Sequence, residues 1–122
     1  MPLHNKILIA DDDSEMLETL SSMLEAEGYS VIKAENGEEA VEFSRKELPA
    51  LVMLDIHMPK MNGLAACKEI KSSAATKAIP VVMLTVEGSI NEIQQAISYG
   101  AKTYITKPSS REEILKVVKS II

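Results

Sequence analysis

Residues 50–55 read ALVMLD, an apolar run of strand length that ends in a carboxylate. A run of this kind, without alternation between polar and apolar residues, is typical of a strand whose two faces are both buried. Four further apolar runs occur at residues 7–10, 29–34, 80–84 and 104–105. We therefore predict five strands in a parallel sheet that helices cover on both faces.

Segments with the spacing of amphipathic helices lie between and after these runs. Their apolar stripes are Met16, Leu20, Met23 and Leu24; Ala40, Val41 and Leu48; Leu64, Cys67 and Ile70; Ile90, Ile93 and Ile97; and Ile114, Leu115, Val117, Val118 and Ile121. Asp13 and Ser110 are suitable N-caps, and Gly28 and Gly100 are suitable left-handed helix ends. The repeated strand–helix order predicts an α/β fold, a doubly wound (βα)5 sandwich with right-handed crossovers.

The bulk properties narrow the class of protein. The chain has 122 residues, of which 46% are hydrophobic and 25% charged, and we expect a single domain over residues 1–122. The formal net charge of −5 argues against direct nucleic-acid binding. No apolar run approaches the roughly 20 residues that span a bilayer, so we expect no membrane insertion. A lone cysteine, Cys67, and an amino terminus without a signal-peptide core predict a cytoplasmic location.

Residues with reactive side chains follow four of the five expected strands. They are Asp11 to Asp13, Asp55, Thr85 and Lys107. Carboxylates that converge at one edge of a sheet need a compensating positive charge, and a donor set of oxygens favours Mg²⁺ or Mn²⁺. Asp55 stands alone after the central strand and is the best candidate for a nucleophile toward phosphorus, whereas Asp11 and Asp12 are placed to hold the metal. Lys107 can supply an ammonium group and Thr85 a hydroxyl donor.

The same segments resemble the receiver domain of two-component response regulators, and in particular the single-domain chemotaxis-type regulators. The matching segments are ILIADDD at residues 7–13, LDIHMP at 54–59, MNG at 61–63, MLT at 83–85 and YITKP at 104–108. They cover nearly the whole chain in the family's order, and the resemblance implies a flavodoxin-like fold whose five parallel strands have the order 2-1-3-4-5.

This resemblance implies a role for each site residue. Asp55 would be the phosphoacceptor; Asp12, Asp55 and the backbone carbonyl of His57 would bind Mg²⁺, with Asp11 assisting through water. Thr85 and Lys107 would contact the phosphoryl group, Tyr104 would be the aromatic switch residue, and Lys107–Pro108 would be a cis peptide. The implied phosphodonor partner is a sensor histidine kinase or a histidine phosphotransfer protein. Chemistry would be limited to self-phosphorylation and autodephosphorylation.

These residues also allow other interpretations. Asp13 is better explained as a helix N-cap than as a metal ligand, and the His57 side chain as solvent-facing. An aspartyl-nucleophile phosphatase or phosphotransferase is the main alternative, because Asp11 and Asp13 form an Asp-x-Asp pattern. That alternative leaves Asp55 and Tyr104 without roles. A flavin- or nucleotide-binding protein ranks last, because the chain lacks a phosphate-cradling glycine loop.

The surface that responds to phosphorylation is expected on the fourth helix, the fifth strand and the fifth helix. Thr85 would move toward the phosphoryl oxygens, and the Tyr104 ring would turn into the space it leaves. Positive residues on this surface, namely Lys102, Arg111, Lys116 and Lys119, predict an acidic protein partner and a monomeric chain. Val86 is bulkier than the alanine or glycine that relatives commonly have there, and we expect it to narrow access to the phosphoryl group.

Overall fold

The computed structural model describes residues 5–86, 89–107 and 109–122, and it has the predicted alternation of strands and helices. The elements are β1 (Lys6–Ala10), α1 (Ser14–Ala26), β2 (Ser30–Ala34), α2 (Gly37–Glu47), β3 (Leu51–Asp55), α3 (Gly63–Ser72), β4 (Val81–Val86), α4 (Ile90–Ser98), β5 (Thr103–Lys107) and α5 (Arg111–Ile121). All neighbouring strands pair in parallel, and their order is β2-β1-β3-β4-β5. The predicted fold class and strand order are confirmed.

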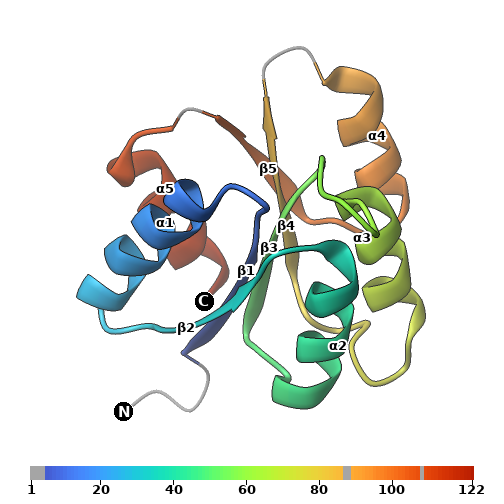
Figure 1. Cartoon of the computed structure of the whole chain (residues 1–122), viewed down its shortest axis with the longest axis horizontal. Helices are drawn as coiled ribbons and strands as arrows, with labels where there is room; N and C mark the ends of the chain where they lie inside the picture. Colours follow the sequence, from blue (N-terminus) through green and yellow to red (C-terminus); the bar gives the residue numbers. More distant parts are fainter. Residues whose placement is uncertain (1–4, 87–88, 108) are drawn as a thin grey trace.

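The helices form two layers on the two faces of the sheet. Helices α1 and α5 cover one face, and α2, α3 and α4 cover the other (Figure 1). Alternate residues of each strand enter different cores: Ile7 and Ile9 of β1 face α1 and α5, whereas Leu8 and Ala10 belong to the core on the opposite face. This alternation follows from the pleat of a strand. Because both sets of side chains are buried, the apolar runs in the sequence of the central strands are not interrupted by polar residues.

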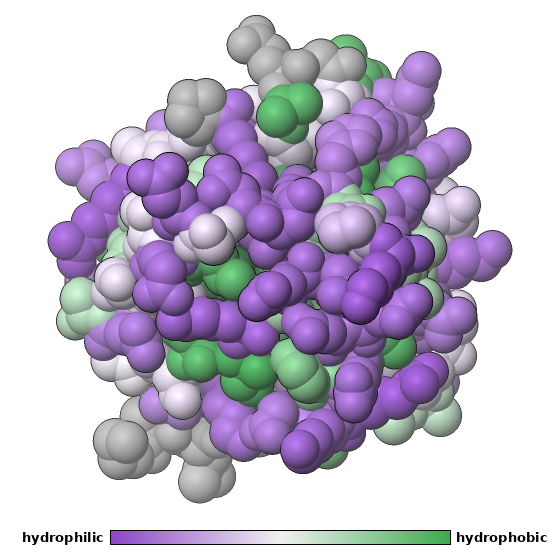
Figure 2. All heavy atoms as spheres, viewed as in Figure 1, coloured by the Kyte–Doolittle hydropathy of each residue, from purple (hydrophilic) through white to green (hydrophobic). Residues whose placement is uncertain are grey.

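Burial on both faces holds for the three central strands. Every residue of β3, and every residue of β1 except Lys6, is buried, as is every residue of β4 except Val86. The outer strands β2 and β5 are only partly buried, because each has a neighbouring strand on one side alone. The face of the molecule drawn in Figure 2 is mainly hydrophilic, and the hydrophobic residues coloured on it form small separate areas.

The helix ends follow the predicted caps. The Asp13 carboxylate accepts hydrogen bonds from the amides of Glu15 and Met16 and opens α1. Ser110 accepts from the Glu113 amide at 3.1 Å and opens α5. Gly28 and Gly100 have φ angles of +95° and +112°, as predicted for left-handed positions after α1 and α4.

Two of the predicted apolar stripes differ from the structure. Leu48 lies outside α2 as its left-handed C-cap and is 55% exposed, so its place on the second stripe was wrong. Ile90 and Ile97 of α4 are 66% and 46% exposed, so these two side chains do not face the core. Periodicity identified the helix correctly, but it does not say which other element covers the apolar side. Within the described residues, no helix is both long and apolar enough to cross a membrane.

Candidate functional site

Three carboxylates meet at the carboxyl ends of the central strands. Asp11 and Asp12 follow β1, and Asp55 is the last residue of β3. These strands are neighbours, with Ala10 opposite Leu54, so the chain positions just beyond them are adjacent. One oxygen from each carboxylate lies within 4.8 Å of the others. The convergence predicted from the strand ends is therefore present.

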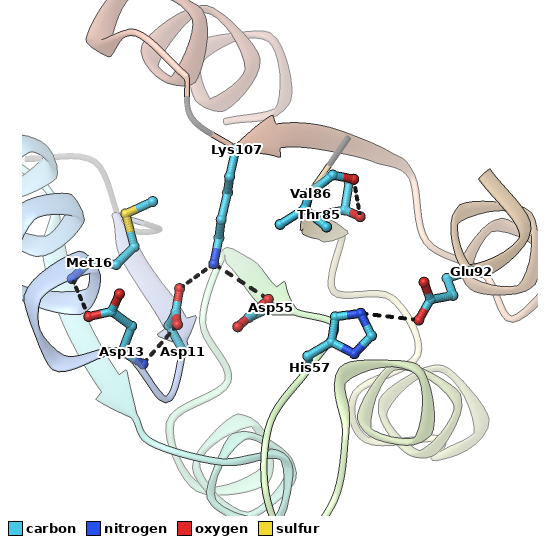
Figure 3. Close-up of polar contacts among 9 residues, drawn as sticks. All are labelled: Asp11, Asp13, Met16, Asp55, His57, Thr85, Val86, Glu92 and Lys107. Carbon is cyan, nitrogen blue, oxygen red and sulfur yellow. Dashed lines mark hydrogen bonds and ion pairs between the residues drawn. The ribbon is translucent and has the colours of Figure 1, made fainter. Parts of the chain in front are cut away.

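Lys107 lies across this cluster and supplies its positive charge. Its Nζ is 2.8 Å from an Asp11 oxygen and 3.4 Å from an Asp55 oxygen (Figure 3). Burial lowers the pKa of Lys107, but the hydrogen bond to Asp11 and the charges of Asp55 and Asp11 outweigh it and raise the pKa. The ammonium form is thus held beside the two carboxylates.

Asp55 is the carboxylate whose protonation the fold changes most clearly. Its burial, followed by the negative charge of Asp11, raises the pKa of Asp55 to about 6, even though Lys107 acts in the opposite direction. A raised carboxylate pKa means that the charged form lacks sufficient compensation in this arrangement. The single positive charge of Lys107 is thus too small to compensate the negative charge of this carboxylate cluster.

The donor set fits a hard divalent cation. All the clustered donors are carboxylate oxygens, which are the ligands that Mg²⁺ prefers, and a dication would add the positive charge that Asp55 lacks. Asp11 is 1% exposed and uses one oxygen for the Asp13 amide, at 3.0 Å, and the other for Lys107. Asp12 is exposed, so its carboxylate remains available from the solvent side.

Asp13 stands apart from this chemistry. Its carboxylate caps α1 and is exposed, as the sequence predicted. The Asp-x-Asp pattern of Asp11 and Asp13 is therefore divided between a buried ion pair with Lys107 and a helix cap. In this structure the two carboxylates therefore have separate structural partners, which disfavours a nucleophile and partner acid at these positions.

The residues expected to contact a phosphoryl group approach from β4 and β5. Thr85 is buried next to the end of β4, and its hydroxyl donates to the Val86 carbonyl at 3.2 Å rather than to Asp55. Tyr104 on β5 is exposed, and so is Val86. The roles of Thr85 and Tyr104 as switch residues and of Val86 as a shield stay predictions. The expected cis peptide at Lys107–Pro108 involves Pro108, which lies outside the described residues.

His57 has a contact that sequence reasoning missed. Its imidazole is largely exposed, as predicted, and its Nε2 lies 3.3 Å from a carboxylate oxygen of Glu92 on α4 (Figure 3). The two residues are far apart in the chain, and no motif links them. The role of the His57 carbonyl as a metal ligand stays a prediction.

Two glycines shape the loop that follows Asp55, which comprises residues 56–62. A Cβ on Gly63 would lie 2.1 Å from the Asp55 carbonyl oxygen, and a Cβ on Gly37 would lie 2.0 Å from the Met61 carbonyl oxygen. The backbone amide of Gly63 donates to the Ile56 carbonyl at 2.8 Å. The approach of Gly37 to the Met61 carbonyl was not foreseen from the sequence.

Comparison with known proteins identifies the family. The model of the response regulator receiver domain matches residues 7–119. PilH of Pseudomonas aeruginosa is 38% identical over 117 residues, which cover 96% of this chain and 97% of PilH. The transcriptional regulator ycf27 of Porphyra purpurea is also 38% identical over 117 residues, but this chain spans only 47% of its length.

Solved structures agree with the family model. The crystal structure of a response regulator from Chloroflexus aurantiacus has a TM-score of 0.91 and 35% sequence identity, and 97% of each chain is covered. The family match extends from β1 to α5, so it includes the segments that carry the acidic cluster and Lys107. The chain belongs to the response regulator receiver domain family and is a receiver domain of two-component signalling.

Proposed function

We propose that Asp55 accepts a phosphoryl group in a reaction that depends on Mg²⁺, and that the phosphorylated chain binds a protein partner. The observation that carries this proposal is the position of the Lys107 ammonium, which bridges Asp55 and Asp11 beside the third carboxylate. A carboxylate oxygen of Asp55 would form a bond to phosphorus while the bond from phosphorus to the donor atom breaks. The donor atom keeps that electron pair, and the product is a mixed anhydride.

The surrounding residues supply position and charge. Asp11, Asp12, Asp55 and the His57 carbonyl would hold the divalent ion, which neutralises negative charge on the transferring group. Lys107 is already within ion-pair distance of Asp55 and would stay beside the phosphoryl oxygens. Thr85 would exchange its present acceptor, the Val86 carbonyl, for a phosphoryl oxygen. Mn²⁺ has a similar preference for oxygen ligands and would substitute for Mg²⁺.

The proposed activity is limited to a single carrier residue. The chain would phosphorylate itself from a phosphodonor and later lose the group to water, without turnover of a separate substrate. The alternative, an aspartyl phosphatase or phosphotransferase, is disfavoured because Asp13 serves as a helix cap. A cytoplasmic location is part of the proposal and is supported by Cys67, which is buried as a free thiol.

The proposed partners are a histidine kinase or a histidine phosphotransfer protein as donor, and a downstream protein bound at the α4–β5–α5 surface. Four large hydrophobic side chains are exposed around this surface, namely Val86, Ile90, Ile97 and Tyr104. Its charge differs from our expectation, because Arg111 and Lys119 pair with Glu27, the C-cap of α1, at 2.8 and 3.2 Å. The proposed contact with a partner therefore rests more on apolar side chains than on positive charge.

Acetyl phosphate with Mg²⁺ tests the chemistry directly. We expect one phosphoryl group per chain, found at Asp55 by borohydride trapping and mass spectrometry, because the site itself positions and neutralises the group. Labelling should disappear when EDTA is added and in Asp55→Asn. Undiminished labelling of Asp55→Asn would refute the assignment, and steady hydrolysis of p-nitrophenyl phosphate would favour the phosphatase alternative.

A further inference from the structure

Helix α4 is weakly embedded in the molecule. Ala96 is its one buried residue, and both Ile90 and Ile97 point their side chains largely into solvent. Its N-cap, Ser89, makes no side-chain hydrogen bond to the helix. Because few buried groups fix α4, a single side-chain contact can contribute substantially to its position.

The loop at residues 56–62 is held differently on its two sides. On the side of α2, the Gly37 amide donates to the Met61 carbonyl at 2.9 Å, and the absence of a side chain on Gly37 permits this approach. On the side of α4, the contact between His57 and Glu92 is the polar link that the described residues provide (Figure 3). The α2 side is thus a close backbone junction, whereas the α4 side is one adjustable side-chain pair.

We infer that the His57 side chain and Glu92 are positioning residues that couple the Asp55 site to α4. His57 is two residues beyond Asp55, so its imidazole must follow any movement of the backbone that would hold the metal. Glu92 lies in the first turn of α4 and transmits that movement to the helix. This inference rests on the proposed function, and it adds a route to α4 besides the one through Thr85 and Tyr104.

The contact is present together with the carboxylate cluster that would hold the metal. It is formed in the same structure in which Asp11, Asp12 and Asp55 bring their oxygens within 4.8 Å of one another. Breaking the contact should therefore weaken Mg²⁺ binding. Both side chains are partly exposed, so the change should be about two- to fivefold, the range that exposed pairs provide.

A double-mutant cycle with His57→Ala and Glu92→Gln tests the coupling. His57→Ala keeps the backbone carbonyl, and Asn91→Ala is the matched control, because Asn91 is an exposed neighbour on α4. Mg²⁺ alone is titrated by calorimetry, and amide hydrogen exchange of residues 90–98 is recorded with and without Mg²⁺. In the parent and in Asn91→Ala, Mg²⁺ should slow this exchange.

In His57→Ala and in Glu92→Gln, Mg²⁺ should no longer slow the exchange. The double variant should have the same Mg²⁺ affinity as the single variant that binds Mg²⁺ more weakly, because each substitution breaks the same contact. The cycle also separates coupling from a simple charge effect. If Glu92→Gln weakened Mg²⁺ binding only by removing a negative charge, it would weaken binding equally in the parent and in His57→Ala. Additive effects on Mg²⁺ binding, or full slowing of exchange in both variants, would overturn the inference. A parent that fails to bind Mg²⁺ would instead refute the proposed function.

Discussion

At the scale of single residues, the raised pKa of Asp55 links the chemistry of the site to stability. The folded pKa, about 6, lies above the ordinary value of 3.8, so the metal-free fold is most stable when Asp55 is protonated. This stability is present below about pH 4 and is lost as the pH rises through about 6. Asp55→Asn removes the charge, so the free energy of unfolding of this variant relative to the parent should increase with pH.

We expect the free energy of unfolding of Asp55→Asn, relative to the parent, to increase by about 1–2 kcal/mol between pH 5 and pH 8. Urea denaturation in EDTA measures it, with Glu112→Gln as a control for the loss of an exposed carboxylate from α5. Added Mg²⁺ should reduce the difference at pH 8, because it stabilises the parent. A difference that does not change with pH would contradict the raised pKa.

Ser21 of α1 offers a second prediction at this scale. Its hydroxyl is fully buried and has no hydrogen-bond partner among the described residues. An unpaired buried hydroxyl costs about 1–3 kcal/mol, so Ser21→Ala should raise the free energy of unfolding by about 1 kcal/mol. Ser44 is the matched control, because its buried hydroxyl donates to the Ala40 carbonyl at 2.7 Å. Ser44→Ala should leave the free energy of unfolding unchanged or lower it. If Ser21→Ala also lowers it, the Ser21 hydroxyl has a hydrogen-bond partner in solution and the prediction is wrong.

At the scale of elements, the start of α3 is tied to the end of β3 through Gly63. Gly63→Ala would place a Cβ 2.1 Å from the Asp55 carbonyl oxygen, so the backbone of the site must move. We expect a loss of about 2–3 kcal/mol in the free energy of unfolding and weaker Mg²⁺ binding. Gly28→Ala is the comparison, because its φ of +95° is strained for alanine, but apart from its chain neighbours no described residue would have an atom within 4 Å of the new Cβ.

Gly28→Ala should cost about 1 kcal/mol and leave Mg²⁺ binding unchanged. Urea denaturation and calorimetric titration of the two variants check both statements. Equal Mg²⁺ affinity in Gly63→Ala and the parent would show that the helix start can shift without moving Asp55.

The elements also show what the sequence could and could not predict. Strands, helices and most caps follow from local patterns. The convergence of the three carboxylates and Lys107 follows from the rule that the ends of parallel strands meet at one edge of the sheet. The contact of His57 with Glu92 and the approach of Gly37 to Met61 depend on distances between separate elements. The exposure of Ile90 and Ile97 was missed for the same reason, because an apolar stripe specifies a helix and leaves its neighbour undefined.

At the scale of the whole molecule, we expect the chain to stay monomeric when the site is filled. Beryllofluoride with Mg²⁺ serves as the phosphoryl mimic, and sedimentation velocity gives the mass. Lys102 is exposed before β5 and Lys116 is exposed on α5, and a symmetric pair formed through the α4–β5–α5 surface would bring this positive charge onto both facing surfaces. This repulsion is modest and weakens with salt, so the measurement should be made at low ionic strength. A shift to the dimer mass would contradict the proposal.

The outward apolar side of α4 has a consequence for how the protein behaves as a solute. Exposed isoleucines are a liability for colloidal stability in concentrated solution, where chains meet often. The Asp55 site depends on the sheet ends and on Lys107, so Ile90 and Ile97 are not needed for its assembly. Polar replacements at these two positions should therefore yield a chain that is easier to concentrate and that still accepts a phosphoryl group at Asp55.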